Sequence, residues 1–198
     1  MNKILTLLVI TLSLFQTTYG QTNFLDKGNQ YLNEENYVAA EQTFREAIKS
    51  DGSNLVYQCQ LALSLINQNK NTEAQLVVDK ILLKDANNVG AIWYGGMNSF
   101  SDKNGDLRKA ISYFERTISL IDKKQGQYFS ANWFIGRSYQ ILLQTDGLSY
   151  KEVSRMLDCY SMYLKLQPDA EDAKKINAFV EHIKTIRPPS NVEKWKSL

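Results

Sequence analysis

Two consecutive segments of the chain decide its fold: QTNFLDKGNQYLNEENYVAAEQTFREAIKSDGSN (residues 21–54) and LVYQCQLALSLINQNKNTEAQLVVDKILLKDANN (residues 55–88). Each segment has about 34 residues, and residues of matching size and polarity recur at that offset. The matching pairs are Gly28 with Ala62, Tyr31 with Leu65, Ala40 with Ala74, Phe44 with Val78, Ala47 with Ile81, and Gly52 with Ala86. An offset shared by six pairs indicates a stacked structural repeat.

Each repeat is predicted to be a pair of helices joined by a short turn. In the first repeat, apolar residues recur at helical spacing from Phe24 to Leu32, and polar residues 33–36 break the pattern. A second helix is predicted from Tyr37 to about Ser50. Small residues at Gly28 and Ala40 lie where the two helices would approach closely.

Later parts of the chain follow the same pattern with insertions. A third repeat begins near Val89, with two extra residues in the turn at residues 101–106. In the fourth repeat, the connection from Leu143 to Val153 is about eight residues longer than the pattern requires. After Pro168, apolar residues form one stripe of an amphipathic helix, which we expect to cover the last repeat.

The predicted architecture is therefore all-α, an α-solenoid of about four helix-turn-helix repeats with a C-terminal capping helix. The expected boundaries are residues 21–54, 55–88, 89–128 and 129–169 for the repeats, 170–187 for the cap, and 188–198 for a flexible tail.

The residues of the first repeat resemble the tetratricopeptide-repeat family. That family's aromatic, Gly, Tyr, Ala, Phe and Ala positions are matched by Phe24, Gly28, Tyr31, Ala40, Phe44 and Ala47. The resemblance implies that the first helix of each hairpin lines a concave, ligand-binding face. Carried over to this sequence, the face comprises Leu25, Asn29, Leu32, Cys59, Leu63, Ile66, Trp93, Met97, Phe100, Trp133, Arg137 and Gln140.

Residues 1–20 are expected to be a secretory signal peptide. Lys3 precedes an apolar run from Ile4 to Phe15, and small residues at Thr18 and Gly20 predict cleavage after Gly20. The run is too short to cross a bilayer, which needs roughly 20 apolar residues. We therefore expect an exported protein of the periplasm or the cell exterior, with no stable membrane span after cleavage.

The charge of the sequence argues about its partners, and its two cysteines about disulfide bonds. Without Lys3, 22 basic and 21 acidic residues remain, and no basic cluster is present, which argues against nucleic acid as a partner. Cys59 and Cys159 fall in the second and fourth repeats. Because packed helices lie about 8–10 Å apart and a disulfide needs closer Cα atoms, two separate thiols are expected.

The sequence offers no convincing catalytic, metal or cofactor site. His182 is the single histidine, so a triad would depend on it alone. No spacing of His, Cys or Asp residues fits zinc or calcium, and no glycine-rich stretch fits a nucleotide. We therefore expect a protein that is not an enzyme.

The leading hypothesis is a non-catalytic interaction module that holds a peptide or helix of a partner protein of the cell envelope in its groove. One rival is carbohydrate or cell-wall binding, suggested by the aromatic groove residues and 11 tyrosines. A second is that Trp93 and Trp133 are partly core residues between helices. A third is an enzyme centred on His182. A further hypothesis is that the tail bearing Trp195 folds into the groove and competes with the partner.

Overall fold

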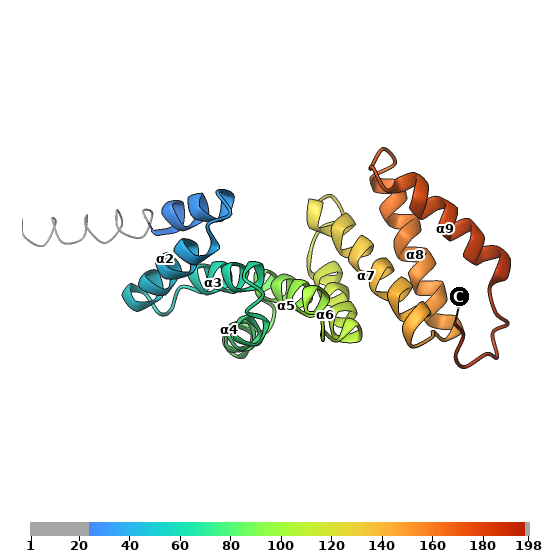
Figure 1. Cartoon of the computed structure of the whole chain (residues 1–198), viewed down its shortest axis with the longest axis horizontal. Coiled ribbons are helices and arrows are strands. Elements are labelled where there is room, and N and C mark those ends of the chain that lie inside the picture. The colour runs from blue at the N-terminus through green and yellow to red at the C-terminus, as the bar shows by residue number, and fades with distance from the viewer. Residues whose placement is uncertain (1–23, 197–198) are drawn as a thin grey trace, which may run out of the picture. The chain divides into compact units, whose positions relative to one another are not determined.

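Helices account for almost all regular structure in this computed structural model, which describes residues 24–196 (Figure 1). A helix at residues 24–33 comes first. The others are α2 (Tyr37–Ser50), α3 (Leu55–Asn67), α4 (Asn71–Lys84), α5 (Val89–Ser101), α6 (Leu107–Leu120), α7 (Gly126–Thr145), α8 (Tyr150–Leu166) and α9 (Ala173–Ile186). The predicted all-α fold is confirmed. The expected signal peptide lies outside the described residues.

The chain forms two compact units, an N-terminal unit up to Ala86 and a C-terminal unit from Asn87. In the N-terminal unit, α2 packs on α3, and α3 packs on α4. Asn36 and Asn54 accept backbone hydrogen bonds from Ala39 and Val56, which satisfies amides at the starts of α2 and α3. The range predicted for α2 is confirmed.

In the C-terminal unit, five helices pack in chain order from α5 to α9. Gly96 on α5 faces the ring of Phe114 on α6, and Gly136 on α7 faces the ring of Tyr160 on α8. A Cβ atom at either glycine would lie within 2.8 Å of the opposing ring, so only glycine permits this approach. The glycine–aromatic contact of one hairpin is thus repeated in another.

The connection between α7 and α8 is shorter than we predicted. The extra residues lengthen α7 to Thr145, and only residues 146–149 lie between the two helices. Ser149 and Glu152 form a reciprocal capping box that begins α8 at Tyr150. The expectation of a long loop from Leu143 to Val153 is therefore wrong, because helical hydrogen bonds use most of these residues.

The C-terminal tail, which we expected to be flexible, packs against the C-terminal unit up to Lys196 in this structure. Trp195 and Leu148 exchange two backbone hydrogen bonds of 2.8 Å. The Trp195 side chain packs against the core of the C-terminal unit, and Lys194 Nζ lies 2.6 Å from Asp146 Oδ1. In this structure the tail therefore lies on the connection between α7 and α8.

The two cysteines are separate buried thiols, as predicted. Cys59 lies on α3 in the N-terminal unit and Cys159 on α8 in the C-terminal unit. Burial raises the pKa of the Cys59 thiol to about 11 and that of the Cys159 thiol to about 12. Both thiols therefore combine a low thiolate fraction with poor access.

Because each unit contains one cysteine, thiol labelling should report on each unit separately. We expect both thiols of the folded protein to react with a disulfide reagent at about pH 8 much more slowly than in urea. Cys59→Ser and Cys159→Ser leave one thiol each and assign the two rates. Rapid labelling of either variant without urea would show that its remaining cysteine is not protected.

Candidate functional site

The predicted groove residues of the N-terminal unit are largely engaged in packing. Asn29 Oδ1 accepts a 2.6 Å hydrogen bond from Gln60 Nε2 on α3. Leu25 and Leu63 are half-buried, whereas Ile66 is only 6% exposed. Ile66 therefore offers little surface to a ligand. Gln60, which the carried-over positions did not include, is the polar residue that holds Asn29.

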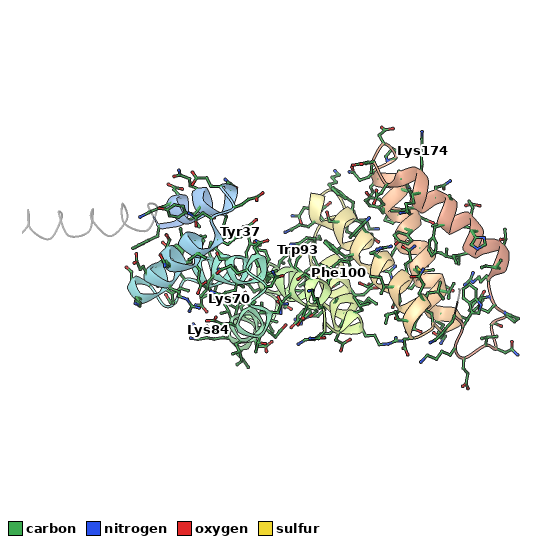
Figure 2. The ribbon with its side chains drawn as sticks, in the orientation of Figure 1. Tyr37, Lys70, Lys84, Trp93, Phe100 and Lys174 are labelled. Atoms are coloured by element: carbon green, nitrogen blue, oxygen red, sulfur yellow. The ribbon has the colours of Figure 1, made fainter. Side chains whose placement is uncertain are left out.

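In the C-terminal unit, the aromatic residues predicted for the groove pack against one another. Trp93 and Phe100 on α5 (Figure 2) meet the ring of Phe134 on α7, with centroid distances of 5.9 and 5.0 Å. Phe134 also stacks on Phe114 at 4.7 Å, and Met97 packs against the same core. These contacts favour the interpretation of Trp93 as a packing residue between helices.

Trp133 differs from the other aromatic residues because it holds the start of the capping helix. Its Nε1 donates a 2.7 Å hydrogen bond to Asp172 Oδ2, and Tyr163 OH on α8 donates a 2.8 Å bond to Asp172 Oδ1. Burial and the bond to Asp172 together raise the pKa of Tyr163 to about 12, so the phenol keeps its proton. Asp172 immediately precedes α9, so these bonds fix α9 against α7 and α8.

Beside this contact is an open hollow of about 380 Å³, which we call the α7–α9 hollow. It is lined by Trp133, Arg137 and Gln140 on α7, Tyr160 on α8, Asp172 immediately before α9, and Lys175, Ile176 and Phe179 in the first half of α9. Its volume is within the range of about 300–1,000 Å³ that is usual for ligand pockets. Three predicted groove residues are therefore brought together at one concavity.

The polar edge of the hollow is ordered by hydrogen bonds. Gln140 Oε1 accepts from Tyr160 OH at 2.6 Å and from Arg137 Nη1 at 3.0 Å. Burial raises the pKa of Tyr160 above its ordinary value, so this phenol also remains a hydrogen-bond donor. The bonds hold the Gln140 amide and the Arg137 guanidinium at the rim.

Two further hollows adjoin the first. One, of about 230 Å³, includes Trp133, Tyr163 and Asp172 in its lining, and the other, of about 480 Å³, includes Tyr163, Asp172 and Lys175. Asp172 lines all three hollows, which therefore lie next to one another. The start of the capping helix is therefore surrounded by three neighbouring hollows.

The contribution of the capping helix was missed from the sequence. Asp172, Lys175, Ile176 and Phe179 lie outside the repeats, so no repeat position could indicate that they face α7. Polar residues before an amphipathic stripe predicted where the helix begins. They contained no information about which side of α7 the helix would meet.

Neither a metal-binding cluster nor a position of His182 at the hollow is found in the described part of the chain. Within residues 24–196, no three His, Cys, Asp or Glu side chains gather closely enough to hold a metal ion. His182 is exposed on α9 and is not among the residues that line the α7–α9 hollow. No helix in this part of the chain is long and apolar enough to span a membrane.

Comparison with known proteins supports the fold. No protein-family model and no curated protein matches the sequence. Among solved structures, MamA protein has a TM-score of 0.64 at 17% identity, covering 85% of this chain and 84% of that chain. A tetratricopeptide repeat protein from Parabacteroides merdae ATCC 43184 has a TM-score of 0.62 at 14% identity, covering 85% of this chain and 61% of that chain.

A third solved structure leads to the same fold. TTC0263, a tetratricopeptide-repeat protein of Thermus thermophilus, has a TM-score of 0.51 at 14% identity and covers 82% of this chain and 99% of that chain. Such low identities establish the fold alone, and the fold agrees with the repeat positions of the sequence. The chain is therefore an all-α helical-repeat protein with the tetratricopeptide-repeat fold.

Proposed function

We propose that this protein is a non-catalytic interaction module that binds a peptide segment of a partner protein, with the α7–α9 hollow as the main contact. The observation that carries the proposal is an open hollow of about 380 Å³ with apolar walls and an ordered polar rim. Extended peptides use such surfaces because apolar side chains supply burial and fixed polar groups set the register.

A peptide suits this concavity better than a carbohydrate does. A sugar site needs several polar groups that can meet hydroxyl groups. Here both carboxylate oxygens of Asp172 accept hydrogen bonds from the protein, and Gln140 Oε1 accepts two. The groups that remain suit a ligand with a large apolar component.

Export is part of the proposal, because it determines where the partner would be found. The apolar run from Ile4 to Phe15 and the small residues at Thr18 and Gly20 support it. The partner would then be a protein of the cell envelope. N-terminal sequencing of the chain recovered from an envelope extract tests this part, since cleavage after Gly20 leaves Gln21 first.

We expect Trp133→Ala to remove at least one protein from the set captured by the immobilised chain from an envelope extract. The change removes part of the apolar wall and releases Asp172. Trp195→Ala is the matched control, because Trp195 packs on the same core but does not line the hollow. Circular dichroism must show that both variants remain helical.

A peptide from the lost protein should bind the purified wild-type chain and not Trp133→Ala. Identical capture by wild type and both variants would contradict the proposal. Binding of glycan fragments without any captured protein would instead support the carbohydrate hypothesis.

A further inference from the structure

We infer that the α7–α9 hollow recognises a partner segment in which a large apolar side chain lies next to an Asp or Glu side chain. The inference rests on the proposed function and adds the chemistry of the partner. It depends on the apolar walls of the hollow, on two cations at its rim that form no ion pair in the described structure, and on the neighbouring hollows.

The walls of the hollow suit an apolar side chain. Trp133 on α7, Tyr160 on α8 and Phe179 on α9 all line it, and the rings of Tyr160 and Phe179 have a centroid distance of 6.0 Å. Ile176 is 8% exposed and completes the wall formed by α9. Burying a large apolar side chain among these residues would supply most of the binding energy.

The rim of the hollow carries two cations with no ionic partner among the described residues. Arg137 and Lys175 are both exposed, and neither forms an ion pair within residues 24–196. One acid, Asp172, also lines the hollow, and its hydrogen bonds from the neutral donors Trp133 and Tyr163 do not cancel a carboxylate charge. The two cations therefore exceed the acid by one. Charge complementarity therefore favours a carboxylate on the ligand.

Glu171, which immediately precedes Asp172, is not among the residues that line the α7–α9 hollow. It lies four residues before Lys175, lines the adjoining hollow of about 480 Å³, and forms no ion pair with Lys175 in the described structure. The α7–α9 hollow itself is lined by two cationic side chains and one anionic side chain.

The adjoining hollows favour the carboxylate of an Asp or Glu side chain inside a peptide segment over the carboxylate of a free C-terminus. Because the adjoining hollows share Trp133, Asp172 or Lys175 with the α7–α9 hollow, they offer space beside it for residues that flank the apolar side chain. The proposed ligand carboxylate is therefore that of an Asp or Glu side chain.

The inference is tested with a library of random peptides that are displayed inside a loop of a carrier protein, so that no peptide has a free C-terminus. The purified chain should enrich peptides in which an aromatic or large aliphatic residue adjoins Asp or Glu. The best peptide, synthesised with an amidated end, is then measured against three proteins. They are the wild type, the double variant Arg137→Gln with Lys175→Gln, and the control Lys123→Gln with Lys124→Gln, whose lysines are exposed before α7.

The double variant Arg137→Gln with Lys175→Gln, the rim variant, should bind the peptide at least about tenfold more weakly than wild type at low salt. The double lysine control should bind it as tightly as wild type does. Replacing the peptide's acid with its amide should weaken binding to wild type by a similar factor. The same replacement should cause little further loss in the rim variant, because the cations and the carboxylate act as pairs.

Three results would overturn the inference. They are enrichment of peptides without an acid, equal affinity of the rim variant and the control, and no enrichment at all. If the enriched peptides are apolar without an acid, and bind Trp133→Ala more weakly than wild type, the inference fails but the proposed function stands. Unchanged capture by Trp133→Ala counts against the function itself, so the two failures are distinguishable.

Discussion

Replacing Phe114 with alanine should lower the free energy of unfolding of the C-terminal unit by about 3–5 kcal/mol. Phe114 has no exposed surface and lies at the centre of the contacts that join α5, α6 and α7. Its ring stacks on Phe134, meets the edge of Trp93 at 5.3 Å, and faces Gly96. The truncation would remove all three contacts and leave a cavity, because glycine cannot fill the space.

Tryptophan fluorescence during urea unfolding is the appropriate measurement. Trp93, Trp133 and Trp195 all lie in the C-terminal unit, so the signal reports on that unit. Leu120→Ala on the same helix is the control, since Leu120 is 39% exposed and its loss should change stability by less than about 1 kcal/mol. Equal midpoints for the two variants would show that Phe114 is not the centre of this packing.

The repeat positions were the part of the fold that the sequence predicted best. Ala40, Phe44 and Ala47 are fully buried on α2, and the matching Ala74, Val78 and Ile81 are fully buried on α4. Each repeat must present the same face to its neighbours, so the same size of side chain is needed at the same offset. This requirement is local and periodic, which is why it can be recognised without coordinates.

The connection between α7 and α8 shows where that reasoning fails. The repeat offset indicated surplus residues but not whether they would form a loop or extend a helix. Ser149 and Glu152 were the available signal, because a Ser or Thr followed three residues later by Glu or Gln begins many helices. A search for capping boxes would have corrected the predicted loop.

The candidate site could be predicted only in part, for a related reason. Trp133, Arg137 and Gln140 share one face of α7, so the repeat pattern grouped them. The other wall depends on which face of α9 meets α7, and that choice is made by the bonds from Trp133 and Tyr163 to Asp172. Trp133 and Asp172 are 39 positions apart, and Tyr163 and Asp172 are 9 positions apart. Such contacts produce no periodic pattern in a single sequence.

Glu41→Gln should destabilise the N-terminal unit at neutral pH and reduce its loss of stability in acid. Glu41 on α2 is 9% exposed and accepts bonds from Arg45 Nε at 2.9 Å, Gln68 Nε2 at 2.8 Å and Lys70 Nζ at 2.7 Å. Burial alone would raise the pKa of Glu41, but the bonds from Lys70, Arg45 and Gln68 outweigh it and lower the pKa to about 2.

The folded-state pKa of Glu41 lies below the value of about 4.5 for a free glutamate, so its contribution is fully present above pH 4.5. It is lost as the pH falls from 4.5 towards 2, because Glu41 then binds a proton in the unfolded chain but remains ionised in the folded chain. We expect a contribution on the order of 2 kcal/mol, reduced by water around Arg45 and Lys70, whose side chains are 40% and 44% exposed.

Urea unfolding followed by circular dichroism at about pH 7 and about pH 3 measures this effect, with Glu46→Gln as a control on the exposed side of α2. Wild type and Glu46→Gln should lose more stability on acidification than Glu41→Gln does. Hydrogen bonds from Lys194 and Arg108 also lower the pKa of Asp146 to about 2 in the C-terminal unit. All three proteins should therefore retain a common acid-sensitive component, and only the difference between variants reports on Glu41. An equal loss in all three would mean that the bonds to Glu41 do not favour its ionised form.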